Sequence, residues 1–227
     1  MNKYLYKINI FISSVVHLRY TSQWHFRAIK MKPKILSIDD VLEQLRSIHS
    51  FEPELDDYFR KIIEFKNLKK KAFLLTPDAI CRHLYFIKKG LLRTYYLKED
   101  GVDVTSGLYK EGDFVVSVHS FYSQTPSAEY IQALEATEVY FISYSQLEDI
   151  YGRYPEFRFV RLQLTIRYLI DYSSQMQLIR AMSGPEKIKA LREKYPDLLN
   201  RVPQKYLSSY VDLTPETFSE LKKRLKS

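Results

Sequence analysis

The alternation of apolar and polar positions divides the chain into helical and extended stretches. Residues 37–48 and 53–63 place apolar side chains three or four positions apart, which predicts two short amphipathic helices. From Lys71 the pattern changes to short runs rich in aromatic and β-branched residues, such as "HLYFIKKG", "LLRTYYLKEDG" and "YIQALEATEVYFIS". Asp100-Gly101 between two of these runs is a strong hairpin signal. We therefore expect seven or eight antiparallel strands in a barrel or roll.

Helical periodicity returns after the extended region. Ser145-x-x-Glu148 has the form of a capping box and predicts the start of a short helix. Pro155 then opens a long helix that reaches about Met182, before Gly184-Pro185 breaks it. Positions along this helix follow the 3-4 spacing of a heptad repeat and define a seam: Phe159, Leu162, Ile166, Leu169, Ser173 and Met176.

The long helix also has a second apolar face, which Phe157, Val160, Leu164 and Tyr168 form. One interpretation is a helix packed only on its own roll. However, a helix with two apolar faces usually contacts two partners. We favour the roll on one side and the same helix of a second copy on the other, which predicts a homodimer.

The stretch from Val202 to Leu225 predicts a helix-turn-helix. Pro203 can open the first helix, and Thr214-Pro215-Glu216 is a typical start for the second. Asp212 stands in the tight turn, where aspartate adopts the left-handed conformation more readily than most residues. We expect the turn and the second helix to bury Leu213, Phe218, Leu221 and Leu225.

The net charge of +8 on 227 residues is unevenly distributed. Residues 1–34 hold seven basic side chains and no acidic one, and residues 183–227 hold ten basic and six acidic ones. The intervening part therefore carries a charge of −3. A basic C-terminal region attracts polyanions such as nucleic acid, although this charge alone fits an ordinary solvated surface equally well.

The first 34 residues are left out of the fold prediction. Their apolar run, Ile8 to Val16, is interrupted by polar residues, and no small-x-small cleavage site follows it. We expect either a later start of translation at Met31 or a loosely attached basic extension. The predicted organisation is then 1–34 for the extension, 35–154 for the roll domain, 155–182 for the long helix and 183–227 for the helix-turn-helix domain.

No catalytic or metal-binding pattern is present in the sequence, so we expect no enzyme activity and no cofactor. The five histidines are scattered, and no phosphate-binding Gly-rich loop or Gly-x-Ser-x-Gly motif occurs. The single cysteine, Cys81, excludes an internal disulfide and fits a reducing compartment. A β-barrel enzyme is the weakest of the functions considered.

The order of these parts resembles the cyclic-AMP receptor / fumarate–nitrate regulator (Crp/Fnr) family of bacterial transcription factors. The resemblance rests on "GDF" at residues 112–114, "EVYFISYSQL" at 138–147 and "VPQKYLSSYVDLTPETFSELKKRL" at 202–225. Two further stretches, "LYFIKKGLLRTYYLKEDG" and "YPDLLNRVPQKYL", are similar to the branch common in Bacteroidetes-type bacteria. The resemblance implies an α+β fold: an antiparallel β-roll (a cyclic-nucleotide-binding-like jelly roll) with flanking helices, a long dimerisation helix and a C-terminal helix-turn-helix.

The resemblance also implies a function. We expect a homodimeric, cytoplasmic regulator of transcription that binds double-stranded DNA at a palindromic promoter site, with RNA polymerase as a further partner. The basic residues of this set would contact DNA phosphates, while the polar residues at the start of the second helix would contact bases. The expected DNA-binding residues are Lys205, Thr214, Glu216, Thr217, Ser219, Lys222, Lys223 and Arg224.

The ligand pocket that the family implies is degenerate here. Ligand-binding relatives carry a Gly-Glu pair and then Arg-Ser/Thr-Ala after "GDF", but this chain has Val116-Ser117 and then Pro126 in place of the arginine. Proline offers neither a charge nor an N–H to a cyclic phosphate, so we expect no cyclic AMP binding in the family's manner. Whether Arg93 or Lys110 replaces the family's arginine stays open, and the identity of the effector stays open as well. The pocket positions are Gly112, Val116, Ser117, Pro126, Ser127 and Ala128.

Further departures from the family concern the binding of an iron–sulfur cluster and the binding of DNA. An iron–sulfur cluster of the Fnr type needs more cysteines than the one present. Glu220 lies mid-way along the second helix, where DNA-binding relatives commonly have an arginine, and a carboxylate there repels the DNA backbone. The sequence also ends at Ser227 with no segment for a β-wing. A ligand-sensing or protein-interaction module with weakened DNA binding is therefore the alternative function.

Overall fold

The structure, a computed structural model, describes residues 36–225 of the chain. These residues belong to one compact unit, Ile35–Ser227. The predicted N-terminal extension and the start at Met31 lie outside the described residues.

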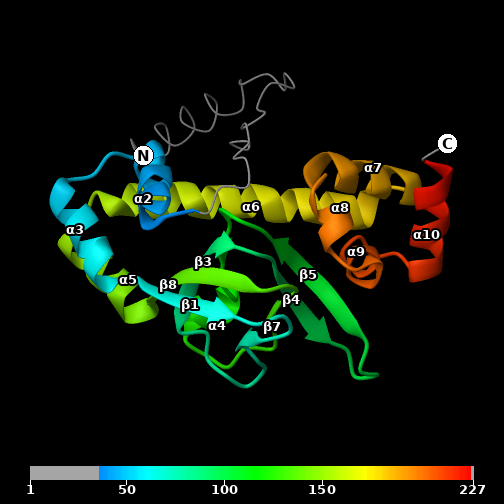
Figure 1. Cartoon of the computed structure of the whole chain (residues 1–227), viewed down its shortest axis with the longest axis horizontal. Helices are drawn as coiled ribbons and strands as arrows, with labels where there is room; N and C mark the ends of the chain where they lie inside the picture. Colours follow the sequence, from blue (N-terminus) through cyan, green and yellow to red (C-terminus); the bar gives the residue numbers. More distant parts are fainter. Residues whose placement is uncertain (1–35, 226–227) are drawn as a thin grey trace, which may run out of the picture. The chain divides into compact units, whose positions relative to one another are not determined.

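Two four-stranded antiparallel sheets form the β-roll (Figure 1). The first has the strand order β1-β8-β3-β6, and the second has the order β2-β7-β4-β5. The predicted antiparallel roll is confirmed. Its strands are β1 (Glu64–Leu68), β2 (Phe73–Leu75), β3 (His83–Lys89), β4 (Leu92–Leu97), β5 (Asp103–Tyr109), β6 (Phe114–Val115), β7 (Tyr130–Ala133) and β8 (Thr137–Ser143).

Turn chemistry sets the connection between β4 and β5. Gly101 has φ +79°, a left-handed value that favours glycine, and the Lys98 N–H donates to the Val102 carbonyl at 2.9 Å. This is the hairpin that Asp100-Gly101 predicts. The sequence pattern misses β1, because four of its five side chains are exposed and no apolar alternation marks it. Pairing with β8 alone holds β1 at the edge of its sheet.

Short helices contribute buried side chains to the core of the roll. They are α2 (Ile38–Ile48), α3 (Pro53–Ile62), α4 (Val118–Ser123) and α5 (Tyr144–Arg153). The prediction that Ser145 caps α5 is wrong. The cap is Ser143, whose Oγ accepts from the Gln146 N–H at 3.2 Å, while Gln146 Oε1 accepts from the Ser143 N–H at 2.7 Å. The capping box therefore lies two residues before the predicted one, because β8 ends at Ser143 and α5 begins at the next residue.

The long helix α6 runs from Phe157 to Ala181, so it begins two residues after the predicted Pro155. Its first turns enter the core of the roll, where Phe157 is 4% exposed and Val160 is fully buried. Beyond that point α6 continues past the roll to the C-terminal helices (Figure 1). No helix in the described part of the chain is long and apolar enough to cross a membrane.

Four helices form the C-terminal helical domain: α7 (Gly184–Lys194), α8 (Leu198–Arg201), α9 (Gln204–Tyr210) and α10 (Pro215–Arg224). A capping box stands at the start of α7, where the Glu186 carboxylate accepts from the Ser183 N–H and hydroxyl at 2.8 and 2.7 Å. The domain does not have a core of its own. Its buried residues share one cluster with Leu91, Leu108 and Leu134 of the roll.

Candidate nucleic-acid interface

The turn between α9 and α10 depends on one left-handed residue. Asp212 has φ +54°, and the Leu213 N–H that follows it donates to the Ser208 carbonyl at 2.9 Å. The side chain of Lys187, on α7, is buried and donates to the Asp212 carbonyl at 3.4 Å. An aspartate at this position is therefore compatible with the turn, as the sequence predicts.

The start of α10 is capped by side-chain chemistry. Thr214 Oγ1 accepts from the Thr217 N–H at 3.2 Å, and Pro215 occupies the first turn of the helix. Phe218 is fully buried and anchors the helix to the rest of the domain. The prediction that Leu225 is buried is wrong, because this side chain is 41% exposed at the end of the helix.

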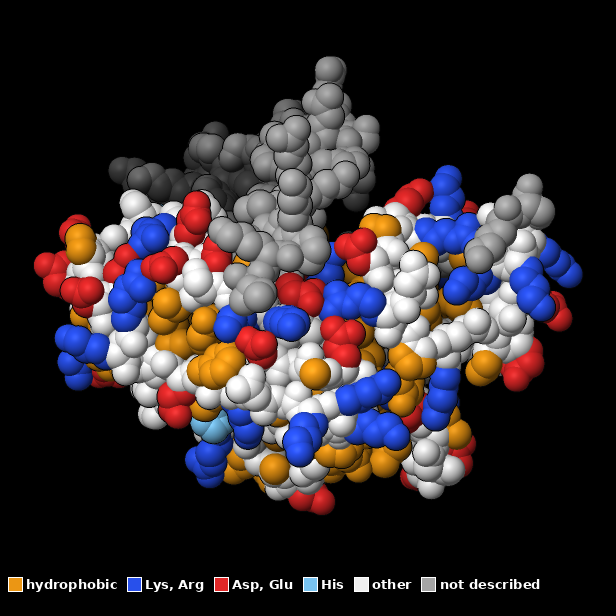
Figure 2. Space-filling model, viewed as in Figure 1, with side chains coloured by type: hydrophobic (Ala, Val, Ile, Leu, Met, Phe, Trp, Pro, Cys, Tyr) orange, Lys and Arg blue, Asp and Glu red, His pale blue; other side chains and the backbone are white. Residues whose placement is uncertain are grey.

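The outer face of α10 has acidic and basic ends. Glu216, Thr217 and Glu220 are exposed along it, while Ser219 and Lys222 are half-buried. The basic side chains belong to the last turn, where they also complement the helix dipole: Lys222, Lys223 and Arg224. Figure 2 shows basic side chains over α7 and the far part of α10, with acidic ones toward its start.

Lys205, the remaining predicted DNA contact, lies on α9 and not beside the basic end of α10. Its side chain is 68% exposed, and its Nζ lies 3.5 Å from Asp103 of β5. The structure therefore brings most of the predicted residues together on α10 and places Lys205 at the edge of the roll.

The predicted seam on α6 is exposed in the single chain. Phe159, Leu162, Ile166 and Leu169 are between 40% and 56% exposed, and Ser173 is exposed as well. Met176, toward the end of the seam, is half-buried. Of the second apolar face, Phe157 and Val160 pack against the roll and Leu164 packs in part, whereas Tyr168 is 44% exposed.

Three of the six predicted pocket residues, Pro126, Ser127 and Ala128, line a small hollow whose described lining contains no Lys or Arg. Ser117 Oγ and Ser127 Oγ, both buried, lie 3.2 Å apart, and Pro126 bridges to Ile80. A hollow of about 470 Å³ lies beside them, and Asp78 is the one charged residue among the described residues of its lining: Pro77, Asp78, Leu97, Pro126, Ser127, Ala128 and Tyr130. Gly112 is elsewhere, since its carbonyl accepts from Gln44 of α2 at 3.4 Å. Val116 packs against the core of the roll.

Neither of the two candidate substitutes for the family's arginine, Arg93 and Lys110, lines this hollow. Arg93 is fully buried against Asp103, with its two terminal nitrogens 3.0 and 3.3 Å from the carboxylate oxygens. Lys110 lies 3.5 Å from Asp197, the residue before α8. Both cations are therefore engaged in other ion pairs.

Comparison with known proteins agrees with this architecture. A family profile described as "Cyclic nucleotide-binding domain" matches residues 65–154. The "Anaerobic regulatory protein" of Pasteurella multocida is 26% identical over 186 residues, which are 77% of this chain and 67% of that protein. The chain is thus similar in sequence to fumarate and nitrate reduction regulatory proteins and similar in fold to Crp/Fnr regulators. The Bacteroidetes-type branch of this family stays a prediction.

Solved Crp/Fnr-type structures share the fold. The structure of FixK2 from Bradyrhizobium japonicum has a TM-score of 0.66 at 18% identity, and the match covers 73% of this chain and 85% of that one. A putative transcriptional regulator of the Crp/Fnr family from Eubacterium rectale has a TM-score of 0.61 at 14% identity, over 78% and 84% of the two chains. These similarities support the arrangement of roll, long helix and C-terminal helices.

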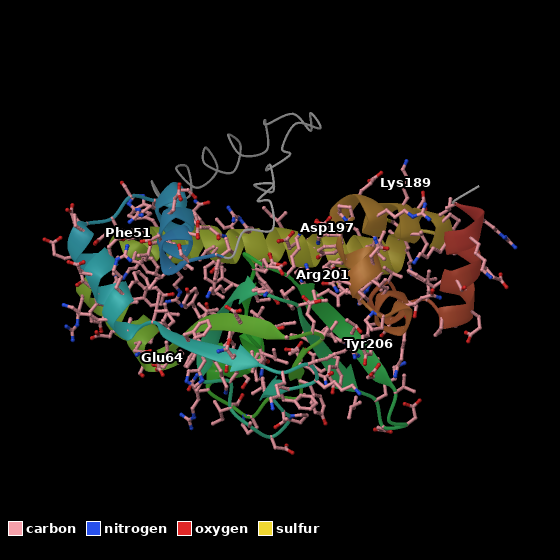
Figure 3. All side chains as sticks on the ribbon, viewed as in Figure 1. Phe51, Glu64, Lys189, Asp197, Arg201 and Tyr206 are labelled. Atoms are coloured by element: carbon pink, nitrogen blue, oxygen red, sulfur yellow. The ribbon has the colours of Figure 1, made fainter. Side chains whose placement is uncertain are left out.

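Within this Crp/Fnr fold, sequence patterns miss the polar residues that join the roll to the C-terminal helical domain. Arg201 of α8 forms ion pairs with Glu111 at 2.8 Å and with Glu135 at 2.6 Å, both from the roll (Figure 3). Burial opposes ionisation of Glu111, but hydrogen bonds from Arg201 and the Gly90 N–H outweigh it and lower the pKa of this carboxyl. These partners are far apart in sequence, so local spacing contains no signal for them.

The aspartate of the "GDF" motif shows the opposite electrostatic effect. Burial raises the pKa of Asp113 to about 6, against the hydrogen bond from the Lys110 N–H, which favours the ionised form. Among residues 36–225, no group of three or more His, Cys, Asp or Glu side chains is arranged to hold a metal ion.

Proposed function

We propose that this protein is a homodimeric, sequence-specific DNA-binding regulator of transcription of the Crp/Fnr type that works in the bacterial cytoplasm. The observation that carries the proposal is the α9–turn–α10 unit, whose second helix is capped, anchored by Phe218 and exposed at its N-terminal end. In a helix-turn-helix, this end of the second helix contacts base edges in the major groove. The bound dimer would then act on RNA polymerase at the promoter.

In this proposal the polar residues of α10 divide into two roles. Thr214, Glu216, Thr217 and Ser219 face the bases, with Glu216 as an acceptor for a cytosine amino group. The basic residues Lys205, Lys222, Lys223 and Arg224 contact phosphates and supply most of the sequence-independent affinity. Glu220, which is exposed on the same helix, makes the preferred site differ from that of relatives with arginine there.

The exposed seam on α6 supports the homodimer. Four large apolar side chains at heptad spacing are each at least 40% exposed in the single chain. A parallel pair of these helices would bury them against each other. The pair would also bring two α10 helices to successive major grooves, about 34 Å apart on a roughly palindromic site.

The roll, in this proposal, does not bind cyclic AMP in the family's manner. A cyclic phosphate needs a cation or several N–H donors once water is excluded. Among the described residues that line the hollow beside Pro126, Asp78 is the one charged group. Isothermal titration calorimetry with cyclic AMP and cyclic GMP tests this point. We expect no heat of binding at 100 µM nucleotide, and micromolar binding would refute the proposed loss of the pocket.

Selection of duplexes from a random DNA library tests the function directly. We expect the purified protein to enrich a palindromic sequence with half-site centres about one helical turn apart. A mobility-shift titration with the selected duplex at low salt then measures the affinity. The exposed Glu220 favours one alternative, a ligand-sensing or protein-interaction module with weakened DNA binding. Recovery of no enriched sequence, together with no shift at low salt, would support that alternative.

A further inference from the structure

A buried arginine of the roll contacts the helix-turn-helix directly. Arg93, on β4, is fully buried, and its guanidinium lies between the rings of Tyr95 and Tyr206, 4.2 and 3.8 Å from their centroids. Asp103 pairs with it, and Thr105 Oγ1 accepts from its Nε at 2.9 Å. Tyr95, Asp103 and Thr105 belong to the roll, but Tyr206 belongs to α9 (Figure 3).

The stability of the roll alone does not account for this arrangement. Burial of an ion pair has a desolvation cost that often offsets its Coulomb energy, so apolar residues would stabilise the strands as well. An arginine also restricts the orientation of its partner, because its planar guanidinium stacks on an aromatic ring in a narrow range of geometries. One of the two faces of Arg93 is covered only when α9 lies against β4 and β5.

A second directional contact lies beside the first, at the free edge of β5. The Thr105 N–H donates to Ser209 Oγ of α9 at 2.9 Å, and Ser209 Oγ donates to the Asp103 carbonyl at 3.3 Å. Because β5 ends the strand order of its sheet, this N–H has no partner strand on that side within residues 36–225. A side chain of the helix-turn-helix therefore completes the hydrogen bonding of the roll.

The apolar contact between the roll and the C-terminal helical domain does not fix this orientation by itself. Leu91, Leu108 and Leu134 join the shared cluster. Burial of apolar surface is non-directional, so this cluster holds the two parts together while permitting small rotations. The geometry of α9 is set where Arg93 and Thr105 meet Tyr206 and Ser209.

These contacts leave the recognition helix outside. α10 packs mainly against α7 and α9, and its first turn is exposed. We propose that Arg93, acting through Tyr206, is a positioning residue that fixes the direction of α10 relative to the roll and thereby the spacing of the two half-sites that the dimer accepts. This inference rests on the proposed DNA-binding function and names a determinant of its specificity.

The consequence is measurable because two rigidly held helices tolerate little change in spacing. A second half-site binds as an intramolecular event, whose advantage is lost when the geometry forbids simultaneous contact. If α9 turns more freely on β5, α10 can follow a displaced half-site. Loss of the Arg93 contact should therefore change the spacing preference and leave the affinity for one half-site unchanged.

The test compares Tyr206→Leu with Tyr206→Phe, which keeps the ring over Arg93. The probes are synthetic duplexes with one selected half-site, with two at the selected spacing, and with two whose centres lie about five base pairs further apart, half a helical turn. We expect wild type and Tyr206→Phe to lose about 100-fold in affinity at the wrong spacing, and Tyr206→Leu to lose less than about tenfold. All three proteins should bind the single half-site within about twofold of one another.

A measurement without DNA separates failure of this inference from failure of the proposed function. Hydrogen exchange of the Thr105 amide, which Ser209 holds, should be faster in Tyr206→Leu than in Tyr206→Phe. The inference is overturned if exchange is equal in the two variants, whether or not any of the proteins binds DNA. It is also overturned if Tyr206→Leu keeps the wild-type spacing preference, or if it loses half-site and palindrome binding equally, since Tyr206 would then only support folding.

Discussion

Asp113 of the "GDF" motif makes stability depend on pH in the direction opposite to most carboxylates. Its folded pKa of about 6 lies above the value of about 3.9 expected in the unfolded chain. Below both values the residue is neutral in both states, and above both the folded state bears the cost of a buried charge. Stability from this residue is therefore present at low pH and lost as the pH rises from about 4 to about 6.

Asp113→Asn should remove this dependence. We expect the variant to be more stable than wild type at pH 7, by about 1–2 kcal/mol, with the difference vanishing near pH 4. Urea denaturation between pH 4 and pH 8 measures both curves. A difference that is independent of pH would show that the substitution acts through packing and not through the charge.

The charges on α10 allow a matched comparison of attraction and repulsion. Lys222→Gln should weaken binding to all sequences alike and lower the slope of log affinity against log salt by about one. Glu220→Gln should strengthen binding, since it removes a negative charge that faces the DNA in the proposed complex. Lys66→Gln, on the exposed edge strand β1, changes the net charge equally and should have little effect. A change in preferred sequence with Lys222→Gln would contradict its role as a phosphate contact.

At the scale of elements, the exposed seam on α6 predicts a dimer that one substitution disrupts. Leu162, 53% exposed in the single chain, would face its counterpart across the two-fold axis. Leu162→Glu loses the burial of both leucines and opposes two carboxylates, which should cost more than about 3 kcal/mol and weaken association over 100-fold.

Sedimentation velocity at micromolar concentration distinguishes the oligomeric states. The control is Gln163→Glu, which adds the same charge at an exposed neighbouring position outside the seam. We expect wild type and the control to be dimers and Leu162→Glu to be monomeric. A dimer that survives in Leu162→Glu would assign the dimer interface to another surface.

The elements that the sequence predicts are those with local signals. Pro203, Thr214 and Pro215 mark helix starts, and the Asp100-Gly101 turn marks the hairpin, so α9, α10 and β4–β5 follow from neighbouring residues. Strand β1 carries no such local signal. It is extended because it pairs with β8, which lies about 70 residues further along the chain.

The same distinction holds for the functional site. The predicted DNA contacts on α10 are close together in the sequence, so the periodicity of one helix predicts them as a group. The partners of Arg93, Arg201 and Lys187 are distant in sequence and come near only in the folded chain. In the sequence, Arg93 looks like any basic residue of a strand, and only the structure shows that Tyr206 covers it. The offset capping box of α5 shows that even a local motif is ambiguous when two copies overlap.

At the scale of the whole molecule, Arg201 couples the C-terminal helical domain to the roll. Its two terminal nitrogens donate to both oxygens of Glu111 at 2.8 and 2.9 Å, and Glu111 in turn accepts from the Gly90 N–H at 2.8 Å. Gly90 has φ +105°, and a Cβ there would lie 2.5 Å from Thr137 Oγ1, so this approach of the chain requires glycine. The contact therefore joins α8 to a turn whose conformation requires Gly90.

Arg201→Gln should destabilise the folded chain by about 1–3 kcal/mol at pH 7, because it leaves two partly buried carboxylates without their cation. The lowered pKa of Glu111 fixes the sign of the pH dependence. Stability from the pair is present above the unfolded pKa of about 4.3 and is lost as the pH falls through the folded value, so the difference between the proteins should shrink in acid. Urea denaturation at several pH values measures this difference.

The control is Arg153→Gln, which removes an exposed pair with Asp149 inside α5 and should change the stability little at any pH. An equal loss in the two variants would mean that the Arg201 pairs contribute no more than surface ion pairs. The roll and the C-terminal helical domain would then be joined by the shared apolar cluster and by the contacts of Arg93 and Thr105 with α9. A larger loss for Arg201→Gln that fades in acid would assign part of this coupling to the ion pair of Arg201 with Glu111.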